Sequence, residues 1–281
     1  MLFRSQLSSR IHAIREQTGV SSNTILTLYF LESILRRISL SEKKEVFVFK
    51  GGFLLSSSLG VKLRTTKDLV LEVQGIDIEP KSLITVFRDI LSLEIDDHIY
   101  YEIIGFEPIR ELDPYGGLRC KIVCMLENIK QTVAIDIAAG DPITPGAEKY
   151  AYQPLFGKEP ISILSVNFET ILAEKFHIIT YKGLANSRSK DFYDIYAIVK
   201  LKGGQIDRQI LRAAFENTFA HRHTALNFDQ FSQLLPTLRG DPLMQTRWNA
   251  FARQNPYASG INYDDTIQAC NEILELVKNA S

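Results

Sequence analysis

The strand signal of this chain nearly disappears after about residue 160, and that change constrains the fold more than any other feature. Before it, β-rich runs alternate with amphipathic segments; after it, apolar residues recur almost entirely at helical spacing. A chain of 281 residues can form two domains, each with its own core. We therefore predict an α/β (α+β) domain over residues 1–155 and an all-helical domain over residues 156–281.

The first domain is predicted to mix helices and strands. Helices are expected over residues 5–18, 22–38, 53–59 and 80–94, with Ser21 among the residues that can cap the second. Strands are expected over residues 45–50, 68–73, 100–105, 117–126 and 130–138, with Glu127-Asn128 as a hairpin turn. Prolines and glycines predict a loop-like stretch from residue 140 to about 160.

The second domain is predicted to contain helices only. They are expected over residues 168–182, 189–200, 206–220, 227–235, 241–254 and 263–279. Ser189, Asp241 and Asn262 are the candidate N-caps.

Composition places limits on partners and location. The net charge of -1 gives no overall attraction to nucleic acid or membrane, so any basic surface must be local. The three cysteines have no metal-ligand spacing and are expected to be buried free thiols. With no apolar run of about 18 residues and no signal-peptide core, we expect a cytoplasmic monomer that does not enter a membrane.

A glycine pair follows the first apolar strand. In Lys50-Gly51-Gly52 the strand runs directly into a short helix. Backbone N–H groups at such a helix start can approach a phosphate closely. A simple tight turn explains the same residues.

Two carboxylates occur within apolar strands. Asp68 precedes Leu69, Val70 and Leu71, and Asp136 lies within an equally apolar run. A buried charge is costly unless it is paired or bound to a cation. A salt bridge to Arg64 or a strand-end cap would explain either one alone; together with the glycine pair, they favour a Mg²⁺ site that also holds substrate phosphates.

The helical half contains a third charged cluster. Lys175 is followed by Arg188, Lys190, Asp191 and Asp194, with both aspartates on one helix face and Lys190 four residues before Asp194. Nine Lys or Arg residues but four acidic ones lie between residues 175 and 223. That excess suits contacts with a triphosphate or an RNA backbone, although a solvated helix surface explains any single lysine.

In order and spacing, these pieces resemble the AbiEii/AbiGii toxin family. The pieces are Lys50-Gly51-Gly52, Arg64-Thr65-Thr66-Lys67-Asp68-Leu69, Ala173-Glu174-Lys175 and Arg188 to Tyr196, and the resemblance spans roughly residues 20–205. The family supplies the nucleotidyltransferase of abortive-infection toxin–antitoxin systems, a phage defence, and is related to the MenT toxins. The resemblance implies a DNA polymerase β-like nucleotidyltransferase domain with a mixed sheet, followed by a helical domain.

The resemblance also implies a chemistry. Members use an NTP and Mg²⁺, transfer nucleotides to tRNA 3′ ends or related acceptors, and so stop growth. A separately encoded antitoxin is the expected protein partner.

Roles for individual residues follow from position. Asp68 is expected to be the first metal ligand, and Asp136 the third carboxylate, which helps to deprotonate the attacking hydroxyl. Lys175 and Asp191 are also placed in the catalytic set. The nucleotide contacts are expected from Lys50, Gly51, Gly52, Arg64, Lys175, Arg188, Lys190 and Asp194.

Position 70 departs from the family pattern. Two carboxylates at i and i+2 point to the same side of a strand and can share a metal ion, but Val70 stands where the second Asp is expected. Three explanations are open: an engineered or selected inactivation, a natural pseudo-enzyme that still binds nucleotide or RNA, and replacement by Glu72. Protein nucleotidylylation, with a hydroxyl side chain as acceptor, is a further alternative.

Overall fold

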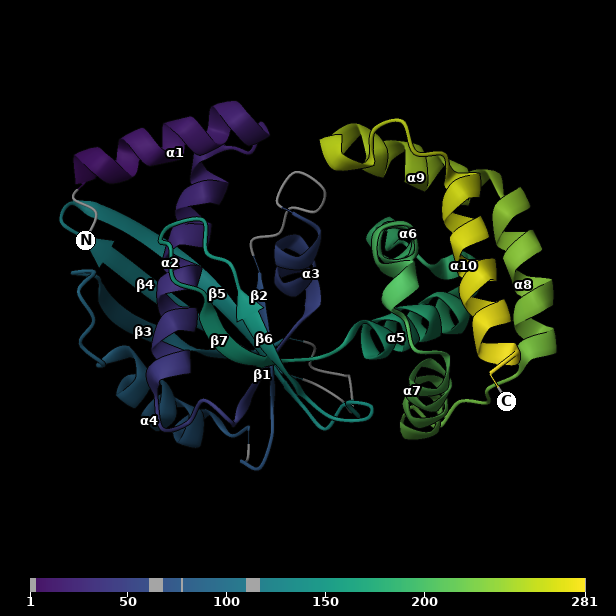
Figure 1. Cartoon of the computed structure of the whole chain (residues 1–281), viewed down its shortest axis with the longest axis horizontal. Coiled ribbons are helices and arrows are strands. Elements are labelled where there is room, and N and C mark those ends of the chain that lie inside the picture. The colour runs from purple at the N-terminus through teal and green to yellow at the C-terminus, as the bar shows by residue number, and fades with distance from the viewer. Residues whose placement is uncertain (1–3, 61–67, 77, 110–116, 281) are drawn as a thin grey trace. The chain divides into compact units, whose positions relative to one another are not determined.

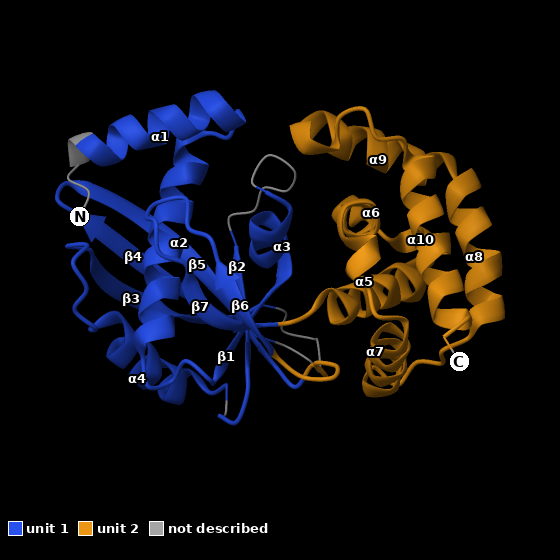
Figure 2. Ribbon diagram, viewed as in Figure 1, with its two compact units in different colours: residues 1–140, 148–165 blue, residues 141–147, 166–281 orange. Residues whose placement is uncertain are grey.

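The chain divides into two compact units (Figures 1 and 2). The computed structural model describes residues 4–60, 68–76, 78–109 and 117–280. The sheet unit consists of residues 1–140 and 148–165, and the helical unit consists of residues 141–147 and 166–281.

A mixed seven-stranded sheet forms the centre of the sheet unit, with the order β3-β4-β5-β2-β1-β7-β6. Strand β2 is parallel to β5, β1 is parallel to β7, and the remaining pairs are antiparallel. The strands are β1 (Phe47–Lys50), β2 (Leu69–Val73), β3 (Tyr100–Pro108), β4 (Leu118–Leu126), β5 (Ile129–Ala139), β6 (Glu148–Tyr152) and β7 (Ile161–Ser165).

Four helices accompany the sheet, and α2 is the most deeply buried of them. They are α1 (Arg4–Thr18), α2 (Ser22–Leu40), α3 (Gly51–Leu59) and α4 (Pro80–Leu91). The Ser21 side chain caps α2 by accepting a hydrogen bond from the Thr24 N–H, as predicted. Helix α2 packs against β5 and β7 and buries an apolar stripe that includes Phe30, Leu31 and Ile34.

A buried carboxylate on α2 holds a distant segment of the sheet unit. Glu32 accepts hydrogen bonds from the Tyr152 hydroxyl at 2.6 Å, the Leu155 N–H at 2.7 Å and the Phe156 N–H at 3.1 Å. Burial raises the pKa of Glu32 from its ordinary 4.5 to about 7, although these hydrogen bonds favour the charged form. The segment after β6 is thereby attached to α2.

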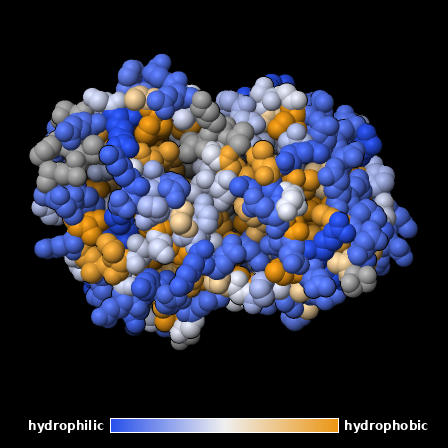
Figure 3. Space-filling view, viewed as in Figure 1, coloured by the Kyte–Doolittle hydropathy of each residue, from blue (hydrophilic) through white to orange (hydrophobic). Residues whose placement is uncertain are grey.

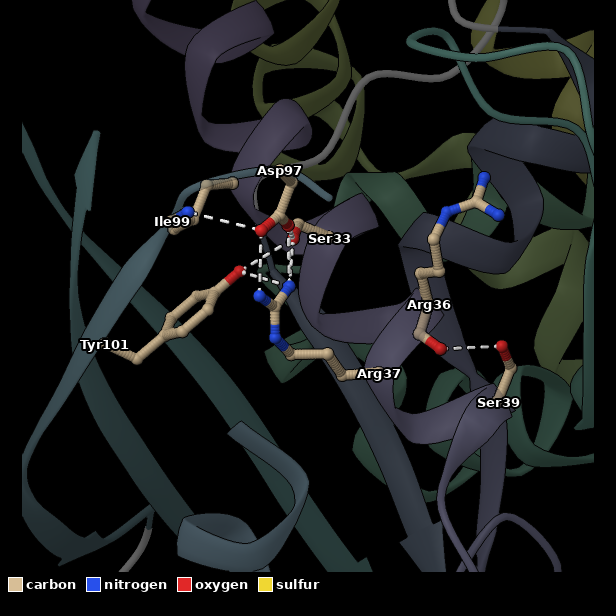
Figure 4. Close-up of polar contacts among 7 residues, drawn as sticks. All are labelled: Ser33, Arg36, Arg37, Ser39, Asp97, Ile99 and Tyr101. Atoms are coloured by element: carbon tan, nitrogen blue, oxygen red, sulfur yellow. Dashed lines mark hydrogen bonds and ion pairs between the residues drawn. The ribbon is translucent and has the colours of Figure 1, made fainter. Parts of the chain in front are cut away.

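One turn later on α2, Arg37 attaches the segment between α4 and β3 (Figure 4). Its guanidinium pairs with both oxygens of Asp97, at 2.6 and 2.8 Å, and lies over the Tyr101 ring. Ser33 donates a further hydrogen bond to Asp97. Burial alone would raise the pKa of Asp97, but the hydrogen bonds from Arg37 and Ser33 outweigh it and hold that pKa below its usual value.

The helical unit has an aromatic core. Phe176 lies against Phe215 and Phe231, and Trp248 is fully buried beside Tyr263. The α-helices are α5 (Phe168–Lys182), α6 (Ser189–Lys202), α7 (Arg208–His221), α8 (Phe228–Gly240), α9 (Pro242–Gln254) and α10 (Tyr263–Lys278).

A short segment from the middle of the chain belongs to the helical unit. The Thr144 carbonyl accepts a hydrogen bond from the Asn167 amide at 2.8 Å, and the Thr144 N–H donates to Thr170 Oγ1 at 3.1 Å. Asn217 donates to the Thr144 hydroxyl at 2.9 Å, and Arg222 pairs with Asp141. These contacts attach residues 141–147 to α5 and α7.

Most predicted elements are confirmed, including the hairpin turn at Glu127-Asn128, which joins β4 to β5. The prediction of a loop from residue 140 to about 160 was wrong for Glu148–Tyr152, which form β6. The prediction of helices only after residue 155 was wrong for Ile161–Ser165, which form β7, because these two strands pair with each other at the sheet edge. Asp241 and Asn262 are N-caps as predicted, but Arg188 occupies that position for α6 and Ser189 is its first residue. The cysteines are buried free thiols.

The exterior shows hydrophilic and hydrophobic residues intermixed. On the face drawn in Figure 3, hydrophilic residues predominate and hydrophobic residues gather in several separate groups. Within the described part of the chain, none of the helices combines the length and the apolar character needed to cross a membrane.

The raised pKa of Glu32 predicts a specific pH dependence of stability. Because the folded state holds this proton more tightly than the unfolded state, the contribution of Glu32 falls as pH rises from about 4.5 to about 7. Relative to Glu32→Gln, the wild type should lose roughly 2.5 kcal/mol between about pH 5 and pH 8. Urea unfolding at the two pH values measures this, and parallel profiles for the two proteins would contradict it.

Candidate active site

A glycine turn connects β1 directly to α3. Gly51 has φ of +76°, a left-handed conformation that residues with a Cβ rarely adopt. A Cβ at Gly51 would lie only 3.1 Å from Val70 Cγ2 and 3.2 Å from Val70 Cβ. Position 51 therefore needs glycine both for its backbone angle and for the close approach of β2. The predicted order of strand, glycine turn and helix is confirmed.

The start of α3 offers hydrogen-bond donors. Lys50 is the N-cap residue and makes no side-chain capping hydrogen bond to the helix. The first N–H groups of any helix have no partner within it, and the helix dipole places partial positive charge there. This turn can therefore bind a phosphate group.

A row of side chains crosses four adjacent strands beside the turn. Val70 on β2 is directly opposite Lys50 on β1 and Asp136 on β5, and Asp136 is opposite Arg119 on β4. Directly opposed residues project to the same face of a sheet. The row thus runs Arg119, Asp136, Val70, Lys50, with the apolar residue between a carboxylate and a cation.

Asp68 lies at the entrance to β2 rather than within it. The strand begins at Leu69, and the Asp68 side chain is exposed. The prediction of a carboxylate inside a buried strand was therefore wrong for Asp68, because its position before the first paired residue leaves it in contact with water. Asp136 is 17% exposed and does lie within its strand.

Arg119 binds Asp136 with a two-pronged contact. Arg119 Nε donates to Asp136 Oδ1 at 2.7 Å, and Nη2 donates to Oδ2 at 2.9 Å. This hydrogen bonding is the main reason why the pKa of Arg119 is raised, and the negative charge of Asp68 adds to it. Both Asp136 oxygens are thus engaged by one guanidinium.

Sequence reasoning missed Arg119, although a signal was present. The two-residue turn Glu127-Asn128 sets the register of the β4–β5 hairpin. Counting outward from that turn places residue 119 opposite residue 136.

The Lys50 side chain forms a buried ion pair with Glu72. Its Nζ lies 3.2 Å from Glu72 Oε2, and the two residues are 6% and 1% exposed. This burial argues against the interpretation in which Glu72 replaces the missing metal ligand. It also means that a phosphate contact by Lys50 would compete with Glu72.

The residues do not fit a magnesium site built from three carboxylates. Val70 has no ligand atom, and Asp136 already accepts hydrogen bonds from Arg119 at both oxygens. Over the described ranges, no group of three or more His, Cys, Asp or Glu residues is placed to hold a metal ion. Arg64, a predicted nucleotide contact, lies outside the described residues.

The helical unit brings its own predicted residues together. Lys175 Nζ on α5 lies 3.0 Å from Asp191 Oδ1 and 2.6 Å from Asp194 Oδ2 on α6, so the two aspartates do share a helix face. Arg188 Nε contacts Asp191 Oδ2 at 2.7 Å. Lys190, also a predicted nucleotide contact, is exposed on α6.

The charges in this cluster are balanced inside the protein. Asp191 and Asp194 are fully buried, whereas Lys175 and Arg188 keep side-chain exposures of 13% and 29%. Burial alone would raise the pKa of Asp191, but the charges of Lys175 and Arg188 outweigh it and hold that pKa at about 2. Asp191 therefore orders two partly exposed cations that can meet a phosphate.

Two solved structures from Helicobacter pylori share this fold. A protein from H. pylori proposed to be a nucleotidyltransferase aligns with a TM-score of 0.51 at 14% identity, over 93% of this chain and 99% of its own. JHP933 aligns with a TM-score of 0.53 at 13% identity, over 92% of this chain and 93% of its own. The predicted fold, a mixed-sheet nucleotidyltransferase unit followed by a helical unit, is confirmed.

A family model identifies the protein more closely. Residues 33–269 match the model described as nucleotidyl transferase AbiEii toxin of type IV toxin–antitoxin systems. The chain belongs to this family and is thus a nucleotidyltransferase of a toxin–antitoxin system, in which a separate antitoxin is the partner. None of the curated protein sequences compared with the chain matches it.

The close approach of Gly51 to Val70 can be tested by stability. Gly51→Ala forces a Cβ into the left-handed region and against Val70, so we expect a loss of roughly 1–3 kcal/mol in the free energy of unfolding. Gly240→Ala, at the end of α8, is the control: a Cβ there meets nothing within 4 Å and the backbone is not left-handed, so the change should be neutral or slightly stabilising. Denaturant unfolding compares them, and equal effects would refute the proposed constraint.

The buried cluster in the helical unit makes a second stability prediction. Asp191→Ala leaves the Lys175 and Arg188 charges without their shared partner, which should cost roughly 3–5 kcal/mol. Asp264→Ala removes an exposed, solvent-screened pair with Arg239 and should leave the unfolding transition almost unchanged. Similar losses in urea unfolding would show that Asp191 has no special structural role.

Proposed function

We propose that this protein is a growth-arresting toxin that transfers an NMP from an NTP to RNA, with a tRNA 3′ end as the acceptor. Membership of the AbiEii toxin family supports the reaction class and the toxin role. The observation that carries the site assignment is the row across β4, β5, β2 and β1 that adjoins the uncapped start of α3.

Each part of this site has a proposed task. Gly51 and Gly52 at the start of α3 bind the triphosphate through backbone N–H groups. Asp68 and Asp136 are the proposed catalytic carboxylates in the sheet unit, and Asp136 is the candidate to accept the proton of the attacking hydroxyl. Because both of its oxygens are bound to Arg119, that role requires at least one of these contacts to open.

In the helical unit, we assign phosphate binding to Lys175 and Arg188. Their partial exposure and their fixed attachment to Asp191 support this role. Lys190, which is exposed on the same helix as Asp191, is proposed as a further contact to nucleotide or RNA. Lys50 in the sheet unit and Asp194 in the helical unit are each proposed to support the nucleotide contacts of their own unit from buried ion pairs.

Val70 makes this chain an impaired form of such an enzyme. We infer that members of the family use Mg²⁺ for the transfer reaction. A bound Mg²⁺ ion would need a carboxylate ligand at position 70, where this chain has valine. The position is half-buried and next to Gly51, so an aspartate there would keep access to water. Loss of one of three carboxylates should reduce the rate by on the order of 10³ or more.

A non-catalytic nucleotide- or RNA-binding protein is the second candidate function. Val70 and the occupied Asp136 carboxylate favour it, while the glycine turn would still bind phosphate. The same site could also modify a protein hydroxyl, since the transfer chemistry does not depend on the class of acceptor.

Restoring the carboxylate separates these functions. Val70→Asp should arrest growth when expressed and should label RNA 3′ ends from an NTP in the presence of Mg²⁺, at least about 10³-fold faster than the wild type. Val70→Asn, similar in size but uncharged, is the matched control and should stay slow. The measurement is incubation of total RNA with each labelled NTP, followed by sequencing of the RNA ends.

The outcomes are distinct. If Val70→Asp leaves RNA unlabelled but still binds NTP, the binding function stands and the transferase proposal fails. Label found on protein instead of RNA would change the acceptor class.

A further inference from the structure

Arg119 has no role in the reaction described so far, yet it lies beside two of its acidic residues. It projects from β4 toward Asp136, with 36% of its side chain exposed. Its other opposed neighbour, Glu107 on β3, is paired with Lys121 at 2.8 Å. Arg119 is thus directed to Asp136, and the charge of Asp68 also acts on it.

The contact with Asp136 uses the atoms that a metal ion would need. A divalent ion binds a carboxylate through its oxygen lone pairs, and a two-pronged arginine occupies one site on each oxygen. The guanidinium also carries a fixed positive charge, which repels a second cation brought to the same carboxylate. Arginine and metal are therefore competitors at Asp136.

We propose that Arg119 is an internal cation that takes the place of a divalent metal ion on Asp136. This inference rests on the proposed function, because it concerns the same acidic residues. A divalent cation binds at Asp136 only when Arg119 releases that carboxylate. Val70 and Arg119 consequently lower metal affinity in two separate ways. Val70 supplies no ligand atom, and Arg119 occupies the ligand atoms of Asp136.

Mn²⁺ binding, without nucleotide or RNA, tests this directly. The titration follows the electron paramagnetic resonance signal of free Mn²⁺ with wild type, Val70→Asp, and Val70→Asp combined with Arg119→Met, which keeps an unbranched side-chain stem but removes the guanidinium and its charge. The double variant should bind Mn²⁺ about tenfold more tightly than Val70→Asp alone. Adding Asp136→Asn should abolish that gain.

Lys121→Met in the Val70→Asp background is the matched control. Lys121 lies on the same strand and face as Arg119 and carries the same charge, but it contacts Glu107. Its removal should change Mn²⁺ affinity by less than about threefold. If Arg119→Met gives no gain, a weaker affinity, or only the gain seen with Lys121→Met, the proposal is overturned.

Two further measurements keep the result unambiguous. Unfolding midpoints show whether each variant is folded. If the Arg119→Met variant does not fold, Arg119→Gln takes its place and should also increase the affinity for Mn²⁺. Because no NTP is present, the Mn²⁺ result is independent of transferase activity. Tighter binding together with unlabelled RNA would support the role of Arg119 and reject the proposed function.

Discussion

The contact between Gly51 and Val70 is the constraint on which the candidate site depends. It brings the start of α3 close to Val70 near the start of β2, and the parallel register of β2 with β5 then places Asp136 beside the same residue. The glycine turn and a carboxylate thus adjoin because the Val70 side chain approaches the Gly51 backbone too closely for a Cβ at position 51. The site is a product of sheet register as much as of residue identity.

Charged residues in both units are already neutralised within the protein. Lys50 pairs with Glu72, Arg119 with Asp136, and Lys175 with two aspartates. Buried pairs of this kind fix side-chain geometry, and their net contribution to stability is modest after desolvation. A nucleotide phosphate that binds such a cation must compete with the carboxylate already paired to it. The internal carboxylates therefore limit how tightly each cation can bind a phosphate.

The sequence predicted the fold well where the signal was local. Helix caps at Ser21, Asp241 and Asn262 and the hairpin turn at Glu127-Asn128 depend on residues that are neighbours in the chain, and all were found. Strands β6 and β7 were missed because five-residue strands flanked by proline and glycine look like a loop until their long-range pairing is known.

The site was predictable in part for the same reason. Pattern alone grouped Asp191 and Asp194 on one helix face, whereas their attachment to Lys175 needed the packing of two helices. Burial was the least accessible quantity: Asp68 is exposed although it adjoins an apolar strand, and Lys50 is enclosed although its own side chain is charged. Arg119 could have been found only by carrying the hairpin register outward from the turn to the eighth residue pair.

The attachment of residues 141–147 to the helical unit has a consequence for how this chain can be divided. The backbone passes from one unit to the other three times, after residues 140, 147 and 165. A fragment that starts at residue 166 would lack Thr144 and leave the polar groups of Asn167, Thr170 and Asn217 without their partners. The chain therefore forms two compact units that no single cut of the backbone can separate.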